Sequence, residues 1–175
     1  MGSPPAKWIK LARNQCALNG DNVGTQFPMT SSFVIKAGSS NDEMIKKIPQ
    51  GIKHLVFNCH GFPNKSSYPA HLAIGQTLKA DNVGSCAPLM NNSCSVIWLS
   101  ACNIGGDGLQ LCRNLAQVTG CFVVTQTMGV PDRKMKQDCV EDYYYAMPQY
   151  IDPGGIMISR ADFFDLHQIL EFTRL

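Results

Sequence analysis

A histidine and a cysteine occupy matching places in this chain, each directly after an apolar run long enough for a β-strand. His60 follows the run 54–59, and Cys102 follows the run 95–100 after one intervening alanine. A cysteine attacks carbonyl carbons as a thiolate, and a neighbouring imidazole can take its proton. The pair therefore predicts thiol-based hydrolysis, with Cys102 as nucleophile and His60 as general base.

Backbone groups near both side chains could supply the rest of the chemistry. Acyl transfer develops an oxyanion that backbone N–H groups stabilise, and we expect Gly61 and Cys102 to donate them. The segment from Asp107 to Gln110 has the spacing of a capping box, which predicts a helix whose positive end lowers the pKa of a nearby thiol. Asp107 is also a candidate wall of a substrate pocket.

Alternating strand and helix patterns surround these residues. The segment 1–32 is rich in Gly, Asn, Pro and Ser and is predicted to be a partly ordered arm, and 33–175 a single domain. Strands are predicted at 32–37, 54–59, 71–75, 76–78, 95–100, 121–125 and 156–158, and helices at 42–48, 82–90, 107–120, 135–147 and 162–172. This order predicts an α/β fold with a mainly parallel sheet and helices on both faces. In such sheets chemistry occurs beyond the carboxyl ends of the strands.

Two sequence segments carry a resemblance to a known superfamily. Residues 55–61 (LVFNCHG) and 97–106 (IWLSACNIGG) resemble the two active-site motifs of the caspase, metacaspase, separase and CHAT peptidases, clan CD. The segment from Leu99 to Gly105 is closest to the LSAC-x-x-G pattern of CHAT domains. The resemblance implies a caspase-like three-layer sandwich, a His60/Cys102 dyad and hydrolysis of peptide bonds. The caspase pentapeptide Q-A-C-[RQG]-G is absent, so specificity for Asp is not implied.

Other functions fit the same residues less well. A non-catalytic pseudoprotease or protein-binding module on the same fold is the main alternative. A glutamine amidotransferase would place its nucleophile in G-x-C-x-G with the histidine downstream, whereas Ser100 and Ile104 occupy those glycine positions. The segment 104–108 lacks the Lys-Ser/Thr of a phosphate-binding loop.

The remaining cysteines and histidines are predicted to be structural. Cys59 should point to the opposite side of its strand from His60, and all seven other cysteines are interpreted as buried free thiols from a reducing compartment. His54 and His71 are interpreted as structural or surface groups, and His167 as exposed. The cysteine spacing fits no metal site, and the chemistry needs no cofactor.

Composition limits the partners. The hydrophobic share is 45%, the charged share 16% and the net charge +2, which is typical of globular proteins and argues against nucleic acid or an anionic membrane as partner. No apolar run reaches the roughly 20 residues of a membrane span. The absence of a signal-peptide pattern predicts a protein that is cytoplasmic, or delivered without a conventional signal peptide. The expected partner is a protein or peptide substrate.

Overall fold

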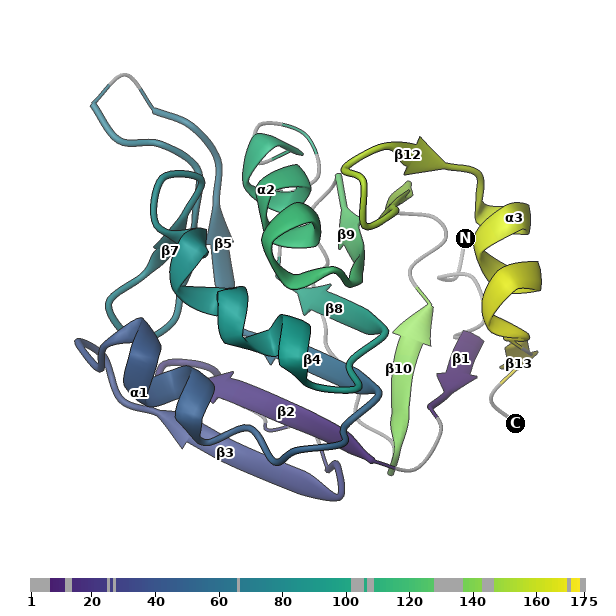
Figure 1. Cartoon of the computed structure of the whole chain (residues 1–175). Helices are drawn as coiled ribbons and strands as arrows, with labels where there is room; N and C mark the ends of the chain where they lie inside the picture. The colour runs from purple at the N-terminus through teal and green to yellow at the C-terminus, as the bar shows by residue number, and fades with distance from the viewer. Residues whose placement is uncertain are drawn as a thin grey trace, which may run out of the picture.

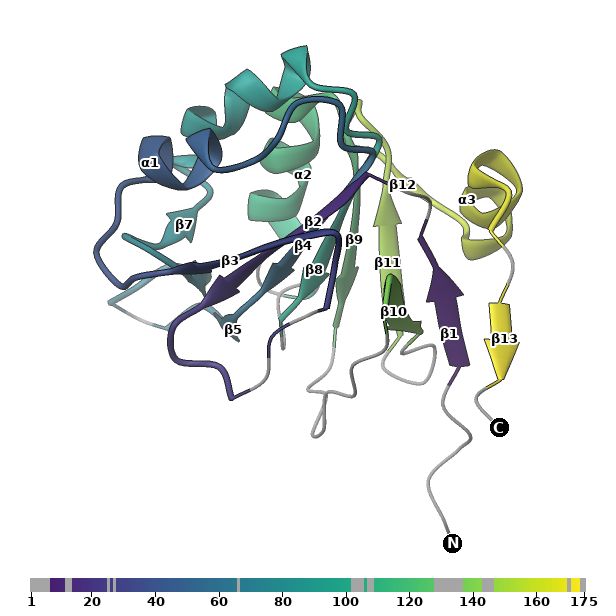
Figure 2. The ribbon, with the colours of Figure 1, turned by 90° about the horizontal axis from the view of Figure 1, so that it is seen from below.

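The computed structural model describes residues 7–11, 14–24, 26, 28–65, 67–101, 106, 109–127, 137–142, 147–169 and 171–173. Its centre is a seven-stranded mixed sheet with the strand order β12-β11-β9-β8-β4-β2-β3 (Figures 1 and 2). The strands are β2 (Gln15–Gly20), β3 (Ser31–Ile35), β4 (His54–Asn58), β8 (Val96–Ser100), β9 (Phe122–Gln126), β11 (Pro148–Ile151) and β12 (Met157–Ile158).

The α/β class is confirmed, but the sheet is mixed. β3, β2, β4, β8 and β9 pair in parallel, whereas β11 pairs antiparallel with β9 and with β12. The inner parallel strands β2, β4, β8 and β9 are almost fully buried, which fits the continuous apolar sequences of β4, β8 and β9. β11 was not predicted, because its four residues include a proline and a glutamine and show no clear strand pattern.

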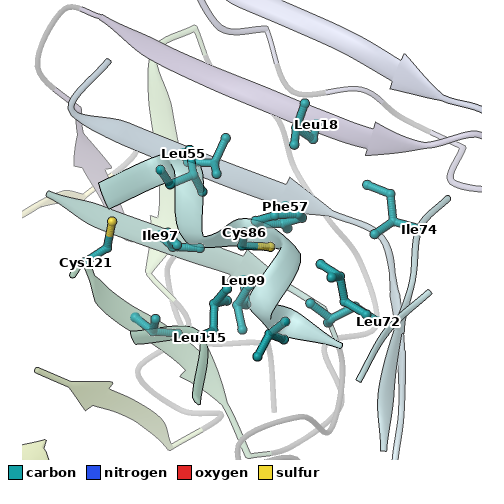
Figure 3. Close-up of a cluster of buried hydrophobic side chains, with 14 of the residues drawn as sticks. Leu18, Leu55, Phe57, Leu72, Ile74, Cys86, Ile97, Leu99, Leu115 and Cys121 are labelled. Carbon is teal, nitrogen blue, oxygen red and sulfur yellow. The ribbon is translucent and has the colours of Figure 1, made fainter. Parts of the chain in front are cut away.

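Three helices cover one face of the sheet. They are α1 (Asn41–Lys46), the 3₁₀ helix η1 (Val83–Asn91) and α2 (Leu109–Thr119), and Figure 2 shows them stacked along one side. Their apolar side chains form one core with the strand residues that point to the same side, among them Leu55, Phe57 and Leu99 (Figure 3). Ser40, rather than the predicted Asn41, caps α1 by accepting a hydrogen bond from the Glu43 N–H at 3.1 Å.

The other face packs against a small antiparallel sheet and the last helix. This sheet has the order β10-β1-β13 and consists of β1 (Lys7–Lys10), β10 (Cys139–Asp142) and β13 (Glu171–Thr173). With α3 (Arg160–His167), it buries a second core around Trp98 and Phe163. Because one helix and a sheet lie on this face, the predicted helical layer on both sides is not confirmed.

The observed elements differ from the predicted ones in further places. The helix predicted at 135–147 is contradicted by β10, because Cys139 and Val140 pair in register with Lys10 and Ile9 of β1. The repeating apolar positions imitate a helix, but pairing with a distant strand decides the local structure. The segment 1–32, which was interpreted as an arm, contains the two strands β1 and β2, and β2 lies between β3 and β4 with all of its residues buried.

A third sheet extends from the end of β4. It has the order β5-β6-β7 and consists of β5 (His60–Phe62), β6 (His71–Ala73) and β7 (Leu78–Lys79). β5 starts only one residue after β4 ends, and it pairs antiparallel with β6. The chain after β4 is therefore held by strand pairing at His60, Gly61 and Phe62.

His54 begins β4 and is hydrogen-bonded to the core. The indole Nε1–H of Trp98 donates to His54 Nδ1 at 3.1 Å, which requires an unprotonated Nδ1. Burial, and after it the positive fields of His167 and Lys53, lower the pKa of His54 from 6.5 to about 4. His54 is therefore a neutral structural group at neutral pH, which is one of the two alternatives, structural or surface, that the sequence left open.

We expect the protein to lose stability in acid because of His54. Between pH 6.5 and 4 the unfolded chain binds a proton on this side chain that the folded chain does not, so the free energy of unfolding falls as the pH falls. The loss from this one half-buried group should reach about 2 kcal/mol at pH 4. Urea unfolding of wild type and His54→Gln across this range measures it, because glutamine keeps an acceptor for Trp98 without titrating. His71→Gln, in the smaller sheet, is the matched control. Equal pH slopes for wild type and His54→Gln would contradict the assignment.

Candidate functional site

A row of buried polar side chains crosses the sheet at the carboxyl ends of its central strands. Asn19 of β2 is the register partner of Asn58 of β4, and Asn58 is the partner of Ser100 of β8. Register partners in neighbouring strands face the same side of a sheet. We call Asn19, Asn58 and Ser100 the polar row. Each is at least nine-tenths buried.

The two asparagines of the polar row are hydrogen-bonded to each other and to β3. Asn58 Nδ2 donates to Asn19 Oδ1 at 2.9 Å, and Asn19 Nδ2 donates to Ser32 Oγ at 3.0 Å and to the Phe33 carbonyl at 3.2 Å. Buried carboxamides are costly unless such bonds satisfy them. The row therefore links three strands at the edge where the sequence predicts chemistry.

Ser100 ends the row beside a very small cavity. The cavity measures about 20 Å³, enough for one water molecule, and Gln126 and Glu141 also line it. Ser100 Oγ is buried and has no hydrogen-bond partner among the residues that the structure describes. In the amide orientation that satisfies its hydrogen bonds, Gln126 donates to the Leu99 carbonyl at 2.8 Å and to the Ala101 carbonyl at 3.2 Å, which fixes the backbone directly before Cys102.

The predicted base His60 lies just beyond this row and is exposed. His60 follows Asn58 by two residues, as Cys102 follows Ser100. The His60 Nε2 atom lies 3.2 Å from the carbonyl oxygen of Asn22, in the turn after β2. A carbonyl only accepts, so this bond puts the proton on Nε2 and leaves the Nδ1 lone pair available to take a proton.

Gly61 and an exposed aromatic group continue from His60. Gly61 is half-buried in β5 opposite Leu72, and its role as an oxyanion donor stays a prediction. Phe62 stacks on His71 with ring centroids 5.1 Å apart, and Tyr68 meets the same imidazole edge-on at 4.7 Å. His71 is thus part of a surface group with two exposed aromatic rings.

The other two predicted site residues, Cys102 and Asp107, lie outside the described residues. The strand before Cys102 and most of the helix after Asp107 are described as β8 and α2. The buried face of α2 includes Cys112, Leu115 and Ala116. Gly120 ends this helix in the left-handed region at φ +69°.

The seven other thiols are all buried and free, as predicted. Burial raises the pKa of Cys16, Cys86 and Cys112 to about 12, so these thiols stay protonated and unreactive near pH 7. Cys94 and Cys121 share a hydrogen bond, which raises the pKa of Cys94 and lowers that of Cys121. Cys59 is fully buried with the helical-face core, on the side away from His60.

The sequence did not reveal the group that orients His60, which is the backbone carbonyl of Asn22. The Asn22 carbonyl comes from the segment interpreted as an arm, and a backbone acceptor leaves no mark in a sequence.

His167 was wrongly expected to be exposed. It is half-buried, with its ring 4.5 Å from the rings of both Phe122 and Phe163.

Comparisons and searches for other kinds of site add little. No protein-family model matches the chain, and no curated protein matches it. Within the described ranges, no three His, Cys, Asp or Glu side chains gather as a metal site, and no helix there is long and apolar enough to cross a membrane.

We expect the Asn19–Asn58 pair to be energetically coupled. Asn58→Leu removes the donor to Asn19 Oδ1 and should lower the free energy of unfolding by about 2 kcal/mol, because a buried acceptor is left unsatisfied. Asn19→Leu should have a similar effect. The double variant should lose at least about 1 kcal/mol less than the sum, as measured by urea unfolding. Strictly additive losses would show that the pair does not act as a unit.

Proposed function

We propose that the chain is a cysteine endopeptidase that uses Cys102 as nucleophile and His60 as base. One observation carries the proposal: β4 and β8 are adjacent parallel strands in register, with Asn58 opposite Ser100. His60 and Cys102 each follow these partners by two residues. The Cys59 N–H also donates to the Ser100 carbonyl at 3.4 Å, so the two strands are still hydrogen-bonded at their last residues.

The hydrogen bond to Asn22 supports the role of His60. With Nε2–H held by a carbonyl, Nδ1 can accept the Cys102 proton, and the carbonyl dipole stabilises the imidazolium that forms. In the proposed reaction the thiolate attacks the peptide carbonyl, and the oxyanion receives the N–H groups of Gly61 and Cys102. His60 then protonates the leaving amine, and water hydrolyses the thioester.

The surroundings favour a peptide substrate over a small molecule. The described cavity beside Ser100 has room only for a water. The exposed aromatic side chains of Phe62 and Tyr68, which contact His71, form a surface next to His60. Such a surface suits an extended chain with apolar side chains. A caspase-like three-layer arrangement belongs to this proposal, as does Asp107 as part of a substrate pocket.

Thiol labelling and cleavage together test the proposal. Iodoacetamide should label Cys102 faster than any other cysteine, because the described thiols are buried. Cys102→Ala should lower the cleavage of a peptide library by at least about 10³-fold. His60→Gln should lower it by about 10²–10⁴-fold.

Cys121→Ala is the matched control, because it makes the same substitution at the described thiol whose pKa is lowered. It should leave cleavage unchanged. Equal labelling of all eight thiols, or cleavage that survives Cys102→Ala, would sink the proposal. Rapid labelling of Cys102 without cleavage of any peptide would favour the protein-binding module instead.

A further inference from the structure

A second cavity lies on the same face of the sheet, at the opposite end of the strands. It measures about 260 Å³, is partly open to solvent and is lined by β1, the start of β4 and the end of α3. His54 belongs to the row Gln15, His54, Val96 and Phe122, which is the first row of this face, whereas the polar row is the last. The cavity is thus separate from the candidate peptidase site.

Part of the cavity wall is apolar, and the cavity volume matches a small ring compound. Ile9, Leu11 and Ile169 supply the apolar side chains. A dry cavity of about 150 Å³ can hold benzene, so 260 Å³ has room for a ring with one polar substituent. Burial of such a ring provides the main attraction for the ligand.

The polar part of the wall includes hydrogen-bond donors. Lys10, whose side chain is exposed, and Gln168, whose amide can both donate and accept, line the cavity. Since Trp98 occupies His54 Nδ1, the remaining proton of that neutral ring is on Nε2. His167 Nε2 is buried without a hydrogen-bond partner in the described part of the chain.

The charge of the site has one sign. No Asp or Glu among the described residues lines the cavity. The charged neighbour of His54 outside the lining is Lys53, which with His167 opposes protonation of His54. A group of donors with no acid among them favours an anion.

We propose that this cavity is a binding site for a small carboxylate with an apolar body, which His54, His167 and Lys10 hold by its oxygens. A metal ion fits less well, because one nitrogen of His54 is occupied by Trp98 and the other carries a proton. The proposal does not depend on peptidase activity.

Benzoate and its neutral isostere benzamide test the site on the whole chain. The chain has two tryptophans, so its ¹⁵N spectrum has two indole N–H signals, and Trp8→Phe identifies that of Trp98. Because this N–H donates to His54, benzoate should shift it with a Kd on the order of 1 mM. Benzamide should bind at least about tenfold more weakly.

Two variants should weaken benzoate binding. His167→Phe keeps the ring contacts with Phe122 and Phe163 but removes the donor, and should raise the Kd about tenfold. Lys10→Gln, at an exposed side chain, should raise it about threefold. Lys36→Gln makes the same charge change at the exposed residue after β3 and should have no effect.

Three results would overturn the proposal. They are equal binding of benzoate and benzamide, a benzoate Kd that neither His167→Phe nor Lys10→Gln raises, and no shift of the Trp98 signal by benzoate. A shift by Zn²⁺ or by inorganic phosphate in place of benzoate would likewise assign the cavity to a different ligand. None of these outcomes bears on cleavage by Cys102.

Discussion

The in-register pairing of β4 with β8 is the constraint on which the candidate site depends. Parallel strands share an edge, so the chain leaves both at the same end of the sheet. A shift of one strand by one residue would exchange its two faces. Leu55 and Phe57 would then leave the helical core, and Asn58 would enter it. Hydrophobic burial thus fixes the register that sets His60 and Cys102 at equal positions after their strands.

One face of the sheet changes in polarity from row to row. The middle row is Ala17, Val56, Trp98 and Val124, and it packs under β1, β10 and α3. This apolar row separates a first row that contains His54 from the polar row. Polar contacts hold β10 and α3, which cover this row, in place. Arg160 of α3 pairs with the buried Asp142 of β10 and donates to Tyr150 Oη at 2.7 Å. Removing Arg160 would take away a charged partner of the buried Asp142 carboxylate.

The sequence predicted the parts of the fold that depend on local patterns. The apolar runs before His60 and near Cys102 are β4 and β8, and the helix that ends at Gly120 is α2. The sequence did not predict the strands whose formation depends on pairing with distant parts of the chain. β2 ends in Asn19 and Gly20, which suggest a loop, yet the cost of burying Asn19 is offset by hydrogen bonds to Asn58, Ser32 and Phe33. β10 is a strand because β1 lies beside it.

The candidate site was likewise predicted only in part from the sequence. Residue type and strand-end position pointed to His60 and Cys102, because a thiol hydrolase would need a cysteine as nucleophile and can use a histidine as base. The group that orients His60 is a main-chain carbonyl of Asn22, and any residue type could present it. What fixes that carbonyl is the turn after β2, whose place is set by the pairing of β2 with β4. The candidate residues His60 and Cys102 could therefore be proposed from the sequence, whereas the orientation of His60 follows from a strand that the sequence did not reveal.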